Sequence, residues 1–203
     1  MRVKDMFLKN EKYKFVFLGI IIFLICPKVY SVTDDRTRIV NHLNSLKYFS
    51  ASFLQNDGEN LSEGKVYIGK ERIRAEYLYP TKILLILDQD KAMYYDYELE
   101  EDEFFNPKKT NAWFFYEVFR NPIFFLDSLL REQNNELIIE KNGVDTEERL
   151  YLIRVIFEKN PIILRSIEIF FNEDFLKLSI FNHNYNEDFD EDFFKLISPK
   201  FLY

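Results

Sequence analysis

This sequence has little of the chemistry on which metal sites and disulfides depend. Of its 203 residues one is a cysteine, Cys26, and two are histidines, His42 and His183. Neither histidine has other ligand residues at metal-site spacing, so we expect both to be ordinary polar residues and the chain to bind no metal. A single cysteine cannot form an internal disulfide, so the domain must be stabilised by its core alone.

Common catalytic motifs are also missing. The sequence has no Gly-x-Ser-x-Gly elbow, and its five glycines form no phosphate-binding loop. Its carboxylates are concentrated at residues 98–103 and 187–192, and acidic runs of this kind are usually solvated surface. We therefore expect a protein that is not an enzyme and that needs no cofactor.

Acidic residues outnumber basic ones after the first 31 residues. The whole chain has 27 basic and 34 acidic residues. Residues 1–31 contain six basic and two acidic ones, which leaves 21 basic and 32 acidic residues, a net charge of −11, for the rest. Nucleic-acid binding needs a basic surface, and an anionic membrane surface should repel a chain of this charge. We expect a monomer that binds no nucleic acid.

A basic segment followed by an apolar one opens the sequence. Five basic residues precede the apolar run at residues 15–26, and Pro27 and the sequence Val29-Tyr30-Ser31 follow it. This is the order of a secretory signal peptide, and the run is short for a membrane span. An uncleaved anchor is the alternative. We expect a signal peptide at residues 1–31 and one domain at residues 32–203.

Aromatic residues are abundant, with 22 Phe and 13 Tyr, and make up 18% of the chain. Concave ligand sites are lined mainly by apolar and aromatic side chains, so this composition favours an apolar cavity or groove. The alternative is a core in which phenylalanine takes the place of smaller residues.

Most of the chain is predicted to form β-strands. Between residues 49 and 97, short runs of β-branched and aromatic residues are separated by breaks at residues 57–60, 70–71, 80–81 and 88–90. Such short connections favour antiparallel hairpins, because parallel strands need long crossovers. Further strands are predicted at residues 99–105, 137–139, 150–157, 162–171 and 175–182, with turns at residues 142–143, 159–161 and 172–174. Residues 83–87 are apolar on both faces and should be covered on both.

Helical spacing of apolar residues occurs in two regions. The first is residues 34–47, and the second is residues 110–131, where Asn121-Pro122 opens a separate helix at residues 123–131. The second region is apolar over more than one stripe, which suits a helix that faces both a sheet and a hydrophobic ligand. The alternative is a lid that is buried simply as core. A short amphipathic element is also predicted at residues 188–196.

The predicted fold is mainly β with α. We expect a strongly curved antiparallel sheet of roughly ten strands, because a long meander twists in one sense along its length. This sheet would be an unclosed half-barrel, with short helices covering its concave face.

Several motifs of the predicted meander resemble, in order and spacing, those of the periplasmic outer-membrane lipoprotein carrier family, LolA. They are Ser52-Phe53-Leu54-Gln55, the run at residues 63–68, Arg74-Ala75-Glu76-Tyr77, the following Pro80, and Tyr94-Tyr95-Asp96 with its acidic strand. The resemblance extends over about residues 33–200 and is weakest between Trp113 and Leu137.

The resemblance implies a periplasmic carrier that binds the acyl chains of lipoproteins in a hydrophobic cavity and ferries them from the inner to the outer membrane. Its partners would be lipoproteins, an inner-membrane lipoprotein-releasing ABC transporter and an outer-membrane lipoprotein receptor. Acyl chains need such shielding, because burial of each methylene is favourable by about 0.8 kcal/mol.

The predicted acyl cavity combines inward-facing strand residues with apolar residues of the middle helices. Its members are Phe53, Val66, Ile68, Tyr77, Leu85, Trp113, Phe114, Phe124, Leu126 and Leu129.

Control of lid closure and transfer is associated, in the family, with an arginine of an Arg-Pro pair after the second strand. Here Lys70-Glu71 stands at that place, and a lysine lacks the planar multi-donor fork of a guanidinium. Arg72 or Arg74 is the expected substitute. The alternative is that all three are exposed strand charges.

Two rival functions stay open. A periplasmic sensor or regulatory domain would use the same half-barrel to detect acylated ligands and signal to a protein partner. A lipid-modifying hydrolase is the other rival, and the missing nucleophile disfavours it.

Overall fold

The computed structural model describes residues 34–145, 147–185 and 187–201. The expected signal peptide, with Cys26, lies outside these ranges. Within them, no helix is long and apolar enough to cross a membrane.

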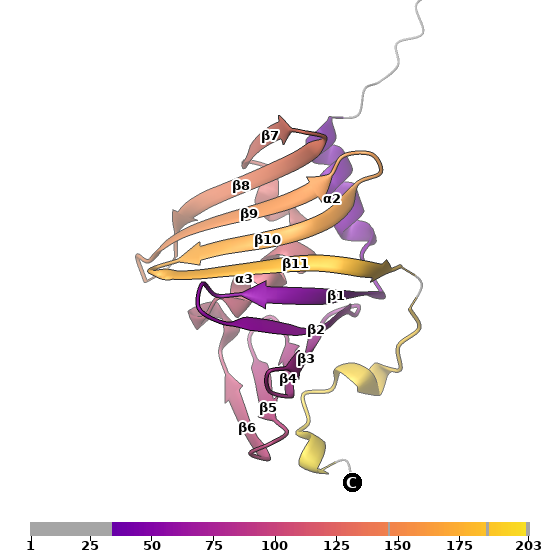
Figure 1. Ribbon diagram of the computed structural model, residues 1–203, viewed down its shortest axis with the longest axis vertical. Coiled ribbons are helices and arrows are strands. Elements are labelled where there is room, and N and C mark those ends of the chain that lie inside the picture. Colours follow the sequence, from indigo (N-terminus) through magenta and orange to yellow (C-terminus); the bar gives the residue numbers. More distant parts are fainter. Residues whose placement is uncertain (1–33, 146, 186, 202–203) are drawn as a thin grey trace, which may run out of the picture. The chain divides into compact units, whose positions relative to one another are not determined.

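Eleven strands in the described ranges form one antiparallel sheet (Figure 1). They are β1 Phe49–Asn56, β2 Leu61–Ile68, β3 Ile73–Tyr79, β4 Ile83–Leu87, β5 Ala92–Asp96, β6 Glu101–Phe105, β7 Leu129–Gln133, β8 Glu136–Val144, β9 Leu150–Glu158, β10 Ile163–Phe171 and β11 Asp174–Asn184. Their order is β6-β5-β4-β3-β2-β1-β11-β10-β9-β8-β7, so two meanders meet where β1 pairs with β11. The sheet ends at β6 and β7 without closing, which confirms the predicted half-barrel.

Bulges add to the curvature of this sheet. The pairing register shifts at residues 50–52 of β1, 63–64 of β2 and 164–166 of β10. A bulge increases the local twist of a strand, and the effect adds to the right-handed twist that every sheet has.

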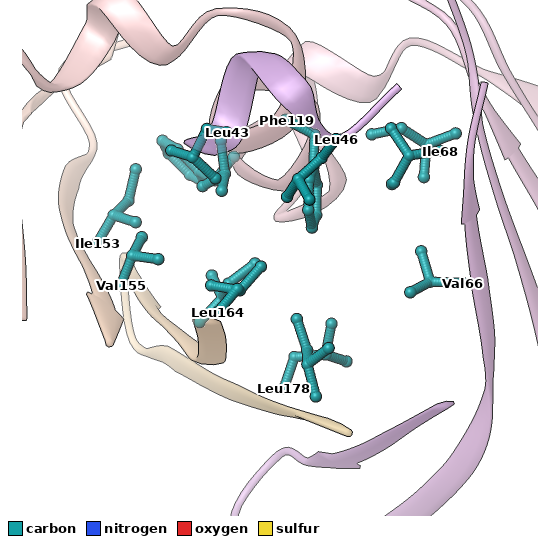
Figure 2. Packing of buried hydrophobic residues seen from close by; sticks show 14 of the residues in the cluster. Leu43, Leu46, Val66, Ile68, Phe119, Ile153, Val155, Leu164 and Leu178 are labelled. Carbon is teal, nitrogen blue, oxygen red and sulfur yellow. The ribbon is translucent and has the colours of Figure 1, made fainter. Parts of the chain in front are cut away.

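Two α-helices of the described ranges, α2 (Asp35–Ser45) and α3 (Ala112–Arg120), lie on one side of the sheet, behind the strands in the view of Figure 1. Four 3-10 turns complete the described elements: η2 Pro107–Lys109, η3 Pro122–Phe125, η4 Glu191–Phe194 and η5 Pro199–Phe201. Figure 2 shows Leu43, Leu46 and Phe119 from the helical layer facing Val66 and Ile68 of β2 on one side and residues of β9, β10 and β11 on the other. The concave side therefore holds the main core.

The prediction of a second helix at residues 123–131 was wrong. Only Pro122–Phe125 forms a helical turn, and Leu129–Gln133 forms the edge strand β7. Leu130 lies opposite Ile139 of β8, which is fully buried. A short isolated helix is marginally stable, so pairing with an apolar neighbouring strand outweighs the local periodicity.

The predicted turn at Asn142-Gly143 was also wrong, because both residues lie inside β8. Gly143 pairs with Tyr151, and a Cβ at this glycine would lie 2.6 Å from the Tyr151 hydroxyl. The glycine therefore permits a close cross-strand contact. The connection to β9 lies further on, where Asp145 Oδ1 accepts a hydrogen bond from the Arg149 amide at 2.8 Å.

The C-terminal segment, residues 187–201, crosses the convex face of the first meander (yellow in Figure 1). Leu84 and Ile86 of β4 form a second buried cluster with Met93 and Tyr95, and Leu196 packs against it. Side chains alternate between the two faces of a strand. The prediction that residues 83–87 are covered on both faces is thus confirmed.

Candidate functional site

An apolar cavity lies between the first meander and α3. Its lining comprises Phe53 and Gln55 of β1, Val66 of β2, Ile73, Ala75 and Tyr77 of β3, Leu85 and Leu87 of β4, Leu178 of β11, and Phe115 and Phe119 of α3. Its volume is about 30 Å³, the space of about one water molecule, whereas ligand pockets measure roughly 300–1,000 Å³. A ligand of ordinary size therefore fits only if the lining rearranges.

The side chains of α3 close the cavity from above the sheet. Phe115 and Phe119 are four residues apart and so project from the same part of the helix surface. Phe119 is buried, whereas Phe115 is partly exposed. Phe114 points to the second meander, where its ring lies 5.1 Å from those of Tyr151 and Phe171. The helix thus contributes separate faces to the core and to the cavity.

One polar pair interrupts the apolar lining. The Tyr77 hydroxyl donates a hydrogen bond to Gln55 Oε1 at 2.8 Å. Burial raises the pKa of Tyr77 to about 12, so the phenol stays neutral at any physiological pH. The Phe53 ring packs edge-on against Tyr77 at 5.1 Å and also lies over Gly64, where a Cβ would come within 2.7 Å of it.

The structure brings four of the ten predicted cavity residues together around this cavity: Phe53, Val66, Tyr77 and Leu85. Ile68 and Phe114 are buried in the core beside it, and Trp113 and Phe124 pack partly exposed against that core. Leu126 and Leu129 are 51% and 49% exposed and do not line the cavity.

Some lining residues escaped the sequence prediction although a signal for them existed. Gln55 continues the inward alternation of Phe49, Ala51 and Phe53 along β1. Phe115 and Phe119 have the spacing of one helical face. Leu178 had no such signal, because its place depends on the long-range pairing of β11 with β1.

Arg120, at the end of α3, ties this helix to the β2–β3 hairpin. Its Nη2 donates hydrogen bonds to the carbonyl oxygens of Gly69 and Lys70, the latter at 3.1 Å. Burial lowers the pKa of the guanidinium. The Lys70 side chain is exposed, and the main-chain carbonyl of this residue accepts the hydrogen bond from Arg120. The arginine that links the two elements therefore belongs to the helix, and its acceptors belong to the hairpin.

The two arginines predicted to control the lid lie elsewhere. Arg72 binds Asp88 at 2.7 Å and the Phe194 carbonyl at 3.3 Å. Arg74 donates to the Phe193 carbonyl at 2.8 Å and places its guanidinium 4.2 Å from the Phe193 ring. Both side chains therefore hold the C-terminal segment on the convex face.

A larger depression, of about 350 Å³, lies between the hairpin and the C-terminal segment. Lys70, Glu71, Arg72 and Asp190 form much of its lining. Charged walls suit an acyl chain poorly, since burying them against hydrocarbon removes their hydration. The small apolar cavity is the better candidate site.

Comparison with known proteins supports the fold. No protein-family model and no curated protein matches this sequence. An uncharacterized conserved protein from Thermus thermophilus superimposes with a TM-score of 0.53 at 10% identity, over 82% of this chain and 96% of that one. MucB gives a TM-score of 0.47 at 8% identity, over 82% of this chain and 64% of its own. The Pseudomonas aeruginosa MucA/MucB complex gives 0.47 at 11%, over 81% and 62%. At these identities, the likeness to the Thermus protein shows a shared fold alone, and the two matches below 0.5 add nothing to it.

Proposed function

We propose that this chain is a periplasmic carrier that binds the acyl chains of lipoproteins beneath α3 and ferries them from the inner to the outer membrane. The observation that carries the proposal is an apolar cavity whose cover is a single short helix. Two hydrogen bonds from one side chain, Arg120, join the end of that helix to the β2–β3 hairpin. We call α3 the lid.

The energies of burial favour the exchange of the two phenylalanine side chains of the lid for an acyl chain while Arg120 keeps its hydrogen bonds. Burying about ten methylenes is favourable by about 8 kcal/mol, whereas exposing two phenylalanine side chains costs roughly 3–6 kcal/mol. An acyl chain can therefore displace Phe115 and Phe119. Apolar contacts between the acyl chain and the lining have no preferred direction. The acyl chain can therefore later pass to a receptor whose cavity binds it somewhat more tightly.

The carrier would act without catalysis. It would receive lipoproteins from an inner-membrane ABC transporter and deliver them to an outer-membrane receptor. The acidic surface suits this task, because it is repelled from anionic membranes between the two steps.

A periplasmic sensor domain is the second candidate, and the β2–β3 hairpin favours it. Arg120 of the lid binds the hairpin backbone from one side. From the other side Phe194 packs so closely on Gly69 that a Cβ there would lie 2.8 Å from its ring. A movement of the lid would therefore also shift the C-terminal segment, and a protein partner bound to that segment could detect the shift.

Release of a lipoprotein from spheroplasts by the purified protein tests the carrier proposal. We expect a soluble complex of the protein with the lipoprotein. Phe115→Glu, which places a charge in the cavity, should abolish release, whereas Leu126→Glu, at an exposed position outside it, should not. Binding of acyl chains without any release would favour the sensor, and no binding at all would contradict both.

A further inference from the structure

The Gln55–Tyr77 pair is out of place in an otherwise hydrocarbon cavity. Every other lining residue is aliphatic or phenylalanine, and among the residues that the structure describes no Lys, Arg, His, Asp or Glu lines it. Gln55 is partly exposed and satisfies the Tyr77 hydroxyl, so the pair adds hydrogen-bonding groups to the cavity at little cost in desolvation.

Donors are left over in this pair. The Tyr77 hydroxyl uses its one proton on Gln55 Oε1 at 2.8 Å. An amide nitrogen carries two protons, and the Gln55 Nε2 makes no hydrogen bond to any residue in the described part of the chain. Tyr77 fixes the orientation of the amide, so its nitrogen is a positioned, uncharged donor.

The pair lies at the outer end of the cavity. Gln55 is the last but one residue of β1 and is partly exposed, whereas Ile73 and Leu87, at the other end, are buried. A chain with its methylenes toward Ile73 would place its polar end beside Gln55.

We propose that Gln55 and Tyr77 receive the carbonyl oxygen of an ester- or amide-linked acyl chain, and that the site takes such uncharged chains in preference to free fatty-acid anions. This inference rests on the proposed acyl-binding function. A carbonyl needs one neutral donor and finds it in Gln55 Nε2. A carboxylate there would lose part of its hydration without gaining a cation, since the described lining holds none. Arg120 of the lid is not part of this lining and donates to the carbonyls of Gly69 and Lys70.

The test compares three ligands of one chain length by calorimetry at pH 8: monopalmitoylglycerol, its ether analogue hexadecylglycerol, and palmitate. We expect the ester to bind about tenfold more tightly than palmitate. Gln55→Leu should weaken ester binding about five- to tenfold, the value of one hydrogen bond, and change binding of the ether, which keeps the glycerol but has no carbonyl, much less. Gln89→Leu, an exposed glutamine in the β4–β5 turn, is the matched control. Tyr77→Phe, which frees the Gln55 amide to rotate, should lower the preference for the ester as well.

The outcomes separate this inference from the function on which it rests. Equal binding of ester and palmitate, or a preference that survives in both Gln55→Leu and Tyr77→Phe, overturns the carbonyl site and leaves the carrier standing. Failure of all three ligands to bind the wild-type protein overturns both.

Discussion

Arg120 is the side chain that joins the lid to the β2–β3 hairpin. Replacing it by glutamine removes two charged hydrogen bonds, each worth roughly 1.5–3 kcal/mol. We expect amide hydrogen exchange along α3 to accelerate about tenfold or more in Arg120→Gln. Arg131→Gln is the control, because that arginine makes only a 3.5 Å ion pair with Glu140 on the far edge of the sheet. Equal exchange rates in both variants would show that Arg120 does not restrain the lid.

The two histidines lie together between α2 and the end of β11. Both approach Tyr185, at 6.2 Å for His42 and 6.1 Å for His183, and His183 Nε2 lies 2.7 Å from the Leu164 carbonyl. Burial lowers the pKa of both imidazoles below 6.5. The positive charge of His183 lowers the pKa of His42 further. The positive charge of Arg165 does the same for His183, against the hydrogen bond to the Leu164 carbonyl.

This pair predicts a loss of stability on mild acidification. Well above pH 6.5, as at pH 8, both histidines are neutral in the folded and unfolded states, so they contribute no pH dependence there. As pH falls through that value the unfolded chain takes up protons first, and the free energy of unfolding should fall. Urea denaturation at pH 8 and at pH 5.5 measures the change, which should shrink in His42→Gln. A stability that stays constant or rises over this interval would contradict the assignment.

At the scale of elements, the position of Leu129 on the edge strand β7, and not in a helix, changes the expected effect of its substitution on stability. Leu129 is half exposed on this edge strand, whereas Ile139 of the neighbouring strand is fully buried. We expect Leu129→Ala to change the free energy of unfolding by about 0.5 kcal/mol or less, and Ile139→Ala to lower it by about 2–5 kcal/mol. Comparable losses, measured by chemical denaturation, would place residues 123–131 in a buried helix after all.

The C-terminal segment carries a second prediction at this scale. Phe194 packs on Gly69 in the turn of the β2–β3 hairpin, which Arg120 binds from the other side. Phe194→Ala should lower the free energy of unfolding by about 3 kcal/mol and also speed hydrogen exchange in α3. Phe201→Ala, at a side chain that is 73% exposed, is the control. Faster hydrogen exchange near η4 with an unchanged exchange rate in α3 would mean that the hairpin does not couple the C-terminal segment to the lid.

Sequence patterns predicted the strands better than the contacts between them. The alternation of β1 predicted a half-buried strand, the two-sided apolarity of β4 predicted its covered faces, and the long run of hairpins predicted the curved sheet. The helix predicted around Leu129 failed because a short apolar run suits a helix or a strand equally well. The role of Arg120 was beyond prediction, since its acceptors lie about 50 residues away and are main-chain carbonyls that no side chain identifies.

At the scale of the whole domain, the sheet has two open edges that are protected differently. Glu101, Asp102 and Glu103 give β6 a run of negative charge, which discourages pairing with another strand. The exposed strand β7 is short and carries Arg131 and Glu132. These features agree with the expected monomer, which sedimentation can test.

The place where an acyl chain binds is the most direct test of this account. A diacylated lipopeptide with a photoreactive diazirine at the end of one acyl chain would be crosslinked to the protein, and the modified peptides identified by mass spectrometry. We predict crosslinks in β3, in β4 and at Phe115 or Phe119 of α3, the residues that surround the cavity. Crosslinks confined to the convex face around Phe189 and Phe194, or to the exposed Leu126 and Leu129, would contradict it.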